Sequence, residues 1–173
     1  MHAEPRPCSP VKESRVTFQL ASPSFTHRGG IPSKFTCEGE DCSPELRWSG
    51  APTGTRSFAL VVDDPDAPDP AAPKRVWVHW VLYNLPGTAD GLVEGVTTEQ
   101  LPRESRPGQN DWHRAGYGGP CPPIGRHRYF FKLYALDVEL PDLGEVDKMR
   151  LLGAMEGHVL AQTELIGTYQ KGD

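Results

Sequence analysis

The sequence predicts a mainly β fold, an antiparallel sandwich of two sheets with Greek-key connections and one helix near the C-terminus. Three runs rich in β-branched and aromatic residues carry this prediction, at positions 57–63, 75–85 and 127–138. The 18 glycines and 18 prolines lie scattered between apolar runs, which indicates many turns rather than a disordered tract. With 173 residues, the chain is expected to form one domain over 15–173, preceded by a flexible polar segment at 1–14.

The first third of the chain predicts short strands. Val16–Leu20, Phe35–Cys37 and Leu46–Trp48 are β-rich runs between turns of Gly, Pro and Ser. The strand expected at 57–63 then runs into Asp-Pro-Asp-Ala-Pro at 64–68. Because proline cannot donate to a strand ladder, we expect the two prolines to end this strand.

Two longer strands and a helix are expected further along. Positions 75–85 (RVWVHWVLYNL) are almost continuously apolar, which is typical of a strand buried on both faces. Positions 127–138 (HRYFFKLYALDV) alternate clearly between apolar and polar residues. Asp147 is the expected N-cap of a helix over 148–162, followed by a final short strand at 163–169. The apolar face expected for that helix consists of Leu152, Met155 and Val159.

Charge and hydropathy exclude several classes of protein. A formal net charge of −5 without a cluster of Lys and Arg argues against binding to nucleic acid or to an anionic membrane surface. No stretch is long and apolar enough to span a membrane. The polar N-terminus lacks the apolar region of a secretory signal, so a cytoplasmic location is expected.

Four cysteines leave the redox state open. Cys37 and Cys42 are near enough in sequence to pair across a tight loop, while Cys8 and Cys121 stand apart. The Cys-x4-Cys spacing has no second matching half, so a structural zinc site is not expected. Reduced thiols and one disulfide are equally compatible with this pattern.

Strand alternation places one ionisable residue on the apolar face of each long strand. These residues are Asp64, His79 and His127. The expected face-mates are Phe58, Leu60 and Val62 for Asp64, Trp77, Val81 and Tyr83 for His79, and Tyr129, Phe131 and Leu133 for His127. A buried carboxylate and imidazole are costly unless they pair with each other or with a ligand. Such a combination suits an oxyanion, which a protonated imidazole would bind.

A glycine- and proline-rich segment at 116–125 (GYGGPCPPIG) precedes His127. Glycines let the backbone N–H groups approach a ligand, so the segment could form an anion-binding nest. It is not a P-loop, because no Gly-Lys-Ser/Thr follows, and nucleotide hydrolysis is not expected. Trp48, Trp80 and Trp112 are expected to be packing residues.

Two other kinds of site use the same three residues. His79, His127 and Asp64 have the ligand types of a zinc site but lack the helical spacing of one. They could also act as acid and base groups of a hydrolase. Against that, no nucleophile-elbow pattern occurs, and the prolines beside Cys121 favour a structural thiol.

Four motifs in one order resemble a known family. They are DDPDAP at 63–68, VHWVLYNLP at 78–86, GYGGPCPP at 116–123 and HRY at 127–129. The combination resembles the phosphatidylethanolamine-binding protein (PEBP) family, which includes the Raf kinase inhibitor proteins, and is most similar to its shorter bacterial and archaeal branch. The resemblance covers roughly residues 16 to 170.

The resemblance implies a two-sheet fold with a small cavity for phosphate, phosphoethanolamine or similar anions. The ligand-binding residues that it implies are Asp64, Asp66, Trp77, His79, Gly119, Pro120, His127 and Tyr129, with Arg128 in the same His-Arg-Tyr motif. We expect no catalytic residue, no metal and no cofactor. The expected function is a binding protein that senses a ligand or regulates a protein in the manner of a kinase or protease inhibitor. A protein partner of either class and a homodimer are compatible with it, and a hydrolase is the alternative.

Overall fold

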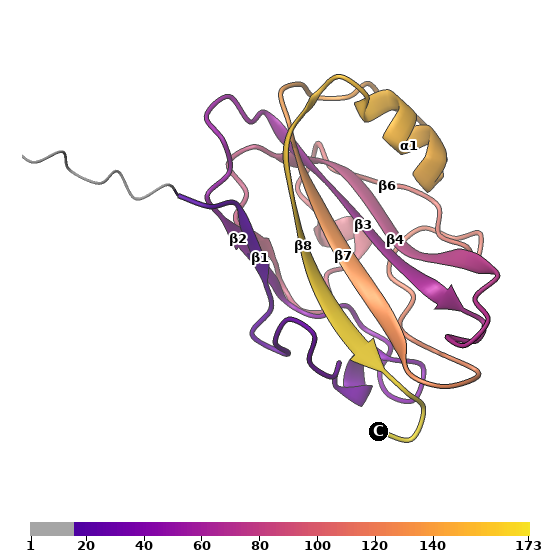
Figure 1. Cartoon of the computed structure of the whole chain (residues 1–173). Helices are drawn as coiled ribbons and strands as arrows, with labels where there is room; N and C mark the ends of the chain where they lie inside the picture. Colours follow the sequence, from indigo (N-terminus) through magenta and orange to yellow (C-terminus); the bar gives the residue numbers. More distant parts are fainter. Residues whose placement is uncertain (1–15) are drawn as a thin grey trace, which may run out of the picture.

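Two antiparallel β-sheets make up most of the structure, which confirms the predicted fold class (Figure 1). The computed structural model describes residues 16–173, so the segment predicted at 1–14 lies outside the described residues. The smaller sheet orders β1 (Gln19–Ala21), β2 (Leu46–Ser49) and β5 (Gly91–Leu92). The larger sheet orders β6 (Arg106–Pro107), β4 (Arg75–Pro86), β3 (Ser57–Ala67), β7 (His127–Leu136) and β8 (Val159–Tyr169). Within it, β3, β4, β6 and β7 have the 4-1-2-3 spatial order of a Greek key.

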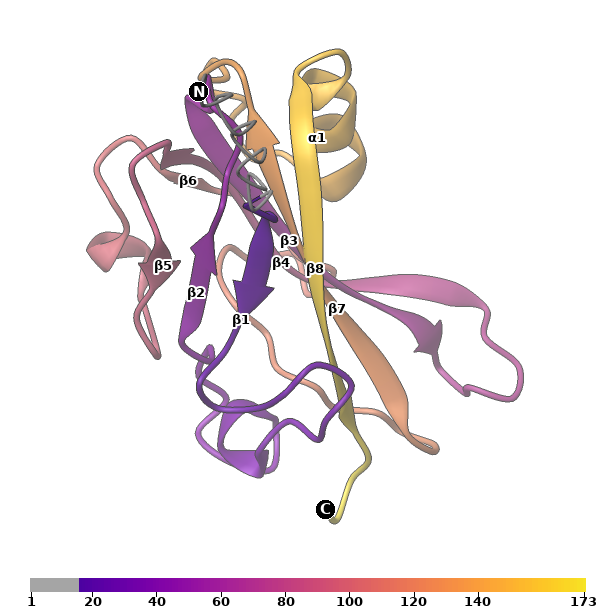
Figure 2. The same cartoon turned by 60° about the vertical axis from the view of Figure 1, so that its left-hand side comes forward.

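Both faces of the larger sheet are covered. The smaller sheet lies on one side and α1 (Lys148–Met155) on the other (Figure 2). Leu60 and Phe131 belong to the core between the sheets, whereas Val61 and Leu151 belong to the core beneath α1. Burial on both faces explains why the sequences of β3 and β4 are almost continuously apolar.

The helix is shorter than predicted. Its N-cap is Asp147, as expected, because the side chain accepts a hydrogen bond of 2.8 Å from the backbone N of Arg150. It ends at Met155 rather than at position 162. Gly157 adopts a positive φ of 80°, which turns the chain out of the helix. Val159 was expected on the apolar helical face but pairs with Leu136 as the first residue of β8.

Several strand limits also differ from expectation. The first strand begins at Gln19 rather than Val16. The strand predicted at Phe35–Cys37 is wrong: the chain forms a short 3-10 helix there, η1 (Ser33–Phe35). A second 3-10 helix, η2, spans Thr98–Gln100.

The strand β3 does not stop before its prolines but continues to Ala67. Asp64 pairs with Trp77 and the next paired residue is Ala67, opposite Arg75. This irregularity spans Pro65, which therefore need not donate an N–H to the ladder. The paired strands consequently extend further than the sequence predicts, and Figure 2 shows them reaching past the smaller sheet.

A β-bulge at His79 changes the facing of β4. Val62 pairs with Trp80, but Asp63 pairs with Val78, so His79 is an extra residue opposite no partner. Trp80 packs between the sheets, whereas Val78 packs on the helix side. The predicted shared face of His79 with Val81 and Tyr83 is therefore wrong, since those two also pack on the helix side.

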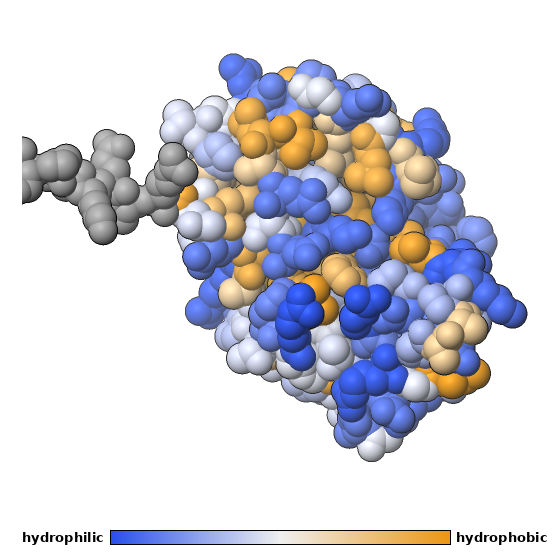
Figure 3. Space-filling model, viewed as in Figure 1, coloured by the Kyte–Doolittle hydropathy of each residue, from blue (hydrophilic) through white to orange (hydrophobic). Residues whose placement is uncertain are grey.

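Figure 3 shows apolar side chains gathered at the end of the molecule that carries α1 and the start of β8. Met149, Val159 and Leu160 are exposed apolar residues of these elements. No helix within residues 16–173 has the length and apolar character needed to cross a membrane.

Candidate functional site

A cavity of about 470 Å³ lies where β3, β4 and β7 meet the glycine- and proline-rich loop. Five of the predicted ligand-binding residues line it: Asp64, Trp77, His79, His127 and Tyr129. The sequence did not single out the other lining residues as ligand-binding: Ala67, Pro68, Lys74, Arg75, Trp112, Cys121, Pro122 and Pro123. A volume of this size is typical of pockets for small organic ligands.

The strands bring the ionisable residues together at one end of the sheet. Asp64 lies near the end of β3, and His127 is the first residue of the neighbouring strand β7. The bulge in β4 turns His79 toward the same cavity that Trp77 lines. Bulges often re-aim a side chain at a binding site in this way.

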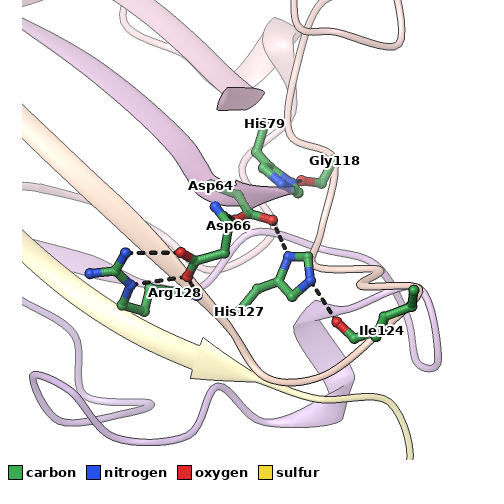
Figure 4. Close-up of polar contacts among 7 residues, drawn as sticks. All are labelled: Asp64, Asp66, His79, Gly118, Ile124, His127 and Arg128. Atoms are coloured by element: carbon green, nitrogen blue, oxygen red, sulfur yellow. Dashed lines mark hydrogen bonds and ion pairs between the residues drawn. The ribbon is translucent and has the colours of Figure 1, made fainter. Parts of the chain in front are cut away.

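Asp64 and His127, which both line the cavity, form a buried pair (Figure 4). Oδ2 of Asp64 lies 2.6 Å from Nδ1 of His127, and Nε2 of the same ring lies 2.9 Å from the carbonyl oxygen of Ile124. Because a carbonyl can only accept, Nε2 carries a proton, and one further proton is shared between Nδ1 and the carboxyl group. The pair is therefore neutral overall. Burial raises the pKa of Asp64, and the hydrogen bond with His127 opposes that shift.

His79 is held as a neutral ring. Its Nδ1 lies 2.7 Å from the carbonyl oxygen of Gly118, so Nδ1 is the protonated nitrogen and Nε2 carries the lone pair. Burial lowers the pKa of this imidazole to about 4, although the Gly118 carbonyl favours the charged form. The ring meets Trp112 and Tyr129 edge-on, with centroids 5.1 and 5.2 Å away.

Two polar groups of the cavity have no partner within the described chain. They are the indole Nε1 of Trp77 and the hydroxyl of Tyr129, both buried. Leaving such a group unpaired costs about 1–3 kcal/mol. Burial raises the pKa of Tyr129, so its hydroxyl stays protonated and able to donate. Both residues line the cavity, and each carries a hydrogen-bond donor that is unpaired in the described chain.

Two cationic residues belong to the same cavity wall. Lys74 and Arg75 both line the cavity. The guanidinium of Arg75 lies over the ring of Trp77 at 4.5 Å, and its Nη2 lies 3.3 Å from Asp111. The combination of donors and cations favours a ligand rich in acceptors and negative charge.

Asp66 does not line the cavity. Its carboxylate accepts hydrogen bonds from the guanidinium of Arg128 at 2.8 and 3.0 Å and from that residue's backbone N at 2.9 Å. Arg128 thereby lowers the pKa of Asp66. This pair ties the end of β3 to the start of β7, which supports the cavity without touching its space (Figure 4).

The loop backbone does not offer the predicted anion nest at Gly118 and Gly119. The Gly118 N–H donates to the carbonyl of His79 at 3.0 Å, and the Gly119 N–H donates to Asp41 at 2.7 Å. Pro120 accepts from Cys37 through its carbonyl at 3.1 Å. Gly119 and Pro120 lie outside the cavity, and their contacts attach the loop to the protein.

Cys37 forms a disulfide with Cys121, while Cys42 is a free thiol. The pairing of Cys37 with Cys42 that the spacing allowed is therefore wrong. Cys121 is separated from Cys37 by 84 positions, and only the folded loop brings the two together. This bond leaves no thiol at Cys121 to act as a nucleophile.

Trp112, which we expected to be a packing residue, lines the cavity. The residue is 38% exposed, and the centroids of its ring and the Trp77 ring are 5.4 Å apart. The side-chain oxygen of Asn110 accepts from the Trp112 backbone N at 3.0 Å, which fixes the turn. A Cβ at Gly118 would collide with this ring, so glycine is required there. The sequence signal was an Asn-Asp turn followed by an aromatic residue.

Within residues 16–173, no group of three or more His, Cys, Asp or Glu side chains is placed to hold a metal ion. Nδ1 of His79 and both ring nitrogens of His127 already pair with groups of the protein. A metal ion would have to displace these partners of His127.

Comparisons with known proteins identify the family of this chain. The family described as phosphatidylethanolamine-binding protein matches residues 21–170. A UPF0098 protein of Methanothermobacter thermautotrophicus is 49% identical over 154 residues, spanning 88% of this chain and 99% of the relative. A UPF0098 protein of Chlamydia pneumoniae is 43% identical over 153 residues, spanning 88% and 99%.

Two solved structures are also similar. A crystal structure of a putative PEBP homologue from Chlamydia trachomatis superposes with a TM-score of 0.83 at 41% identity, covering 90% of this chain and 99% of that one. The Escherichia coli protein YbcL, described as a member of the mammalian PEBP family, gives a TM-score of 0.79 at 33% identity, covering 88% and 98%.

Proposed function

Because this chain belongs to the phosphatidylethanolamine-binding protein family, we propose that its cavity binds small phosphate-like anions and that it serves as a ligand-sensing or protein-regulatory binding protein. One observation carries the anion proposal. The buried donors of Trp77 and Tyr129 have no partner in the described chain, and Lys74 and Arg75 line the same cavity. Phosphate oxygens would satisfy the donors and use the positive charge.

The remaining cavity residues suit the same ligand. The shared proton of Asp64 and His127 cancels the carboxylate charge that would otherwise repel an anion. His79 presents a lone pair at Nε2, so a phosphate that contacts it brings its own proton or protonates the ring. The volume of about 470 Å³ leaves room for an organic group on the phosphate, as in phosphoethanolamine.

Calorimetric titration with phosphate and phosphoethanolamine tests this proposal. We expect saturable binding, and we expect Trp77→Phe and Tyr129→Phe each to weaken it about tenfold, the loss typical of one hydrogen bond to a charged group. Each variant keeps an aromatic ring and removes one donor. Thr98→Ala, in η2 and away from the cavity, is the control and should bind normally. Absence of saturable binding, or normal binding by both aromatic variants, would contradict the proposal.

The regulatory role rests on the family. A kinase or protease partner, a homodimer and a cytoplasmic location stay predictions from the sequence. No observation favours the hydrolase alternative: Cys121 is oxidised, and both nitrogens of His127 are paired within the protein.

A further inference from the structure

One short segment supplies a hydrogen-bond acceptor to each of the two histidines. The carbonyl of Gly118 accepts from Nδ1 of His79, and the carbonyl of Ile124 accepts from Nε2 of His127. Between them, residues 121–123 form part of the cavity wall. The position of this segment therefore sets the hydrogen bonding of both rings and the shape of the cavity together.

The segment is attached unevenly. Its first half is bound to the region of η1 by the Tyr117 hydroxyl on the Phe35 carbonyl at 2.8 Å, by the Gly119 N–H on Asp41 and by the Cys37 N–H on the Pro120 carbonyl. The Gly118 N–H also donates to the carbonyl of His79. For residues 121–124, the polar or covalent ties that the described structure shows are the disulfide at Cys121 and the carbonyl of Ile124. The disulfide is thus the covalent link that attaches the cavity-lining residues 121–123 to the rest of the protein.

This disulfide is open to solvent. Cys37 and Cys121 are both exposed residues, and Cys121 also lines the cavity, so the bond lies at the protein surface. Exposed disulfides are the labile and regulatory ones in general. The free thiol of Cys42 is a poor internal competitor, since burial raises its pKa and keeps it protonated.

We infer that the Cys37–Cys121 disulfide is a redox-controlled latch on the anion cavity. Closed, it holds residues 118–124 where the carbonyls of Gly118 and Ile124 fix the two histidines. Opened, it lets the cavity wall move away from the rings, and the affinity for anions falls. The inference rests on the proposed anion binding.

The opening step is ordinary thiol–disulfide exchange with a dithiol reductant. A thiolate of the dithiol attacks Sγ of Cys121, forms a mixed disulfide and releases Cys37, which takes up a proton. The second thiol of the reductant then closes a disulfide with the first and releases Cys121 as a thiol. Two electrons and two protons pass from the dithiol to the protein. In a reducing cytoplasm, where we predict the protein to be, such a bond is typically transient and redox-sensing.

Phosphate titration of the oxidised and dithiothreitol-reduced protein tests the latch. Reduction should weaken phosphate binding about tenfold, the factor expected if one molecule in ten keeps the closed loop. Reoxidation should restore it. The double variant Cys37→Ser/Cys121→Ser should bind weakly with or without dithiothreitol, while Cys42→Ser should respond as the unmodified chain does.

Two readouts do not depend on phosphate. The imidazole ¹⁵N shifts of His79 report whether Nδ1 stays protonated against Gly118, and amide hydrogen exchange at Gly118 and Gly119 reports release of the loop. We expect reduction to shift the first and to accelerate the second. Unchanged phosphate affinity with unchanged loop signals would overturn the latch, as would global unfolding on reduction, followed by circular dichroism. If the oxidised protein fails to bind phosphate but its loop signals respond, the anion proposal falls and the loop fastening stands.

Discussion

Asp63 and Asp64 are neighbours on β3, but they serve opposite faces of the larger sheet. Asp63 points to the helix side, where Lys132 and Lys148 reach its carboxylate at 3.2 and 2.7 Å. Asp64 points into the cavity and pairs with His127 at 2.6 Å. Both carboxyl groups are buried and both are compensated. Buried charge alone therefore does not distinguish a structural cluster from a ligand site.

Polar atoms without any hydrogen-bond partner distinguish the two faces of the larger sheet. On the helix side, the buried hydroxyl of Tyr83 accepts from the Leu143 backbone N at 2.9 Å. On the cavity side, the Tyr129 hydroxyl and the Trp77 indole have no partner in the described chain. Unpaired buried groups of this kind lower the stability of the folded protein unless a ligand satisfies them. The difference supports the proposal that a ligand completes the cavity, whereas the helix-side carboxylate and hydroxyl are already paired within the protein.

The largest expected effect is the pH dependence of stability that the buried His79 causes. Unfolded histidine has a pKa of about 6.5, and burial lowers that of His79 to about 4. Between these values the unfolded chain binds a proton that the folded protein does not, so this contribution to stability is complete above about pH 6.5 and is lost as the pH falls toward 4. The loss should reach about 3 kcal/mol at pH 4.

Urea unfolding of the unmodified chain and of His79→Gln at pH 7 and pH 4 measures this effect. The unmodified chain should lose more stability than the variant over that interval. Equal losses would mean that the ring is not held neutral by burial.

A smaller loss is expected from the helix side. Asp63→Asn leaves two half-buried ammonium groups without a carboxylate and should lower the free energy of unfolding by about 2 kcal/mol, less than for a fully buried pair because both lysines reach solvent. Phosphate affinity should stay unchanged. Asp137→Asn, which breaks an exposed pair with His158, is the control and should cost under about 0.5 kcal/mol. A marked loss of phosphate binding in a folded Asp63→Asn protein would contradict the claim that the helix-side cluster and the cavity act independently.

The smallest effect compares one substitution on both faces. Tyr83→Phe leaves the Leu143 N–H without its acceptor and should cost about 1 kcal/mol. Tyr129→Phe removes a hydroxyl that has no partner and should leave the ligand-free protein equally stable or slightly more stable. Thermal unfolding in phosphate-free buffer checks both. Destabilisation of Tyr129→Phe equal to that of Tyr83→Phe would contradict the unpaired state of its hydroxyl.

Much of the fold was predictable because it depends on local composition. The runs at 57–63, 75–85 and 127–138 are β-rich enough to predict the central strands, and Asp147 predicts the start of α1. The bulge at His79 was not predictable, since it exists only in the pairing of β4 with β3. One residue of slip was enough to reverse the expected facing of Val81 and Tyr83.

The candidate site was also predictable only where it depends on local sequence. Asp64, His79 and His127 follow from ionisable residues on apolar strands and from the family motifs. The ion pair of Asp66 was not predictable because its partner Arg128 lies 62 positions away. Trp112 was not predicted to line the cavity, because its position depends on the turn that Asn110 fixes and on the space that Gly118 leaves for its ring. Contacts distant in sequence, such as the disulfide, carry no local signal.

Two indole groups offer the most direct test of the claim that unpaired donors bind the anion. The Trp77 Nε1–H has no partner in the described chain, whereas the Trp48 Nε1–H donates to the carbonyl of Ala89 at 2.8 Å and serves as an internal reference. Phosphate should be titrated into the ¹⁵N-labelled oxidised protein while both indole resonances are followed by NMR. We predict a saturable shift of the Trp77 resonance with the Trp48 resonance unmoved. A Trp77 resonance that does not shift, or that shifts only in step with Trp48, would contradict the account.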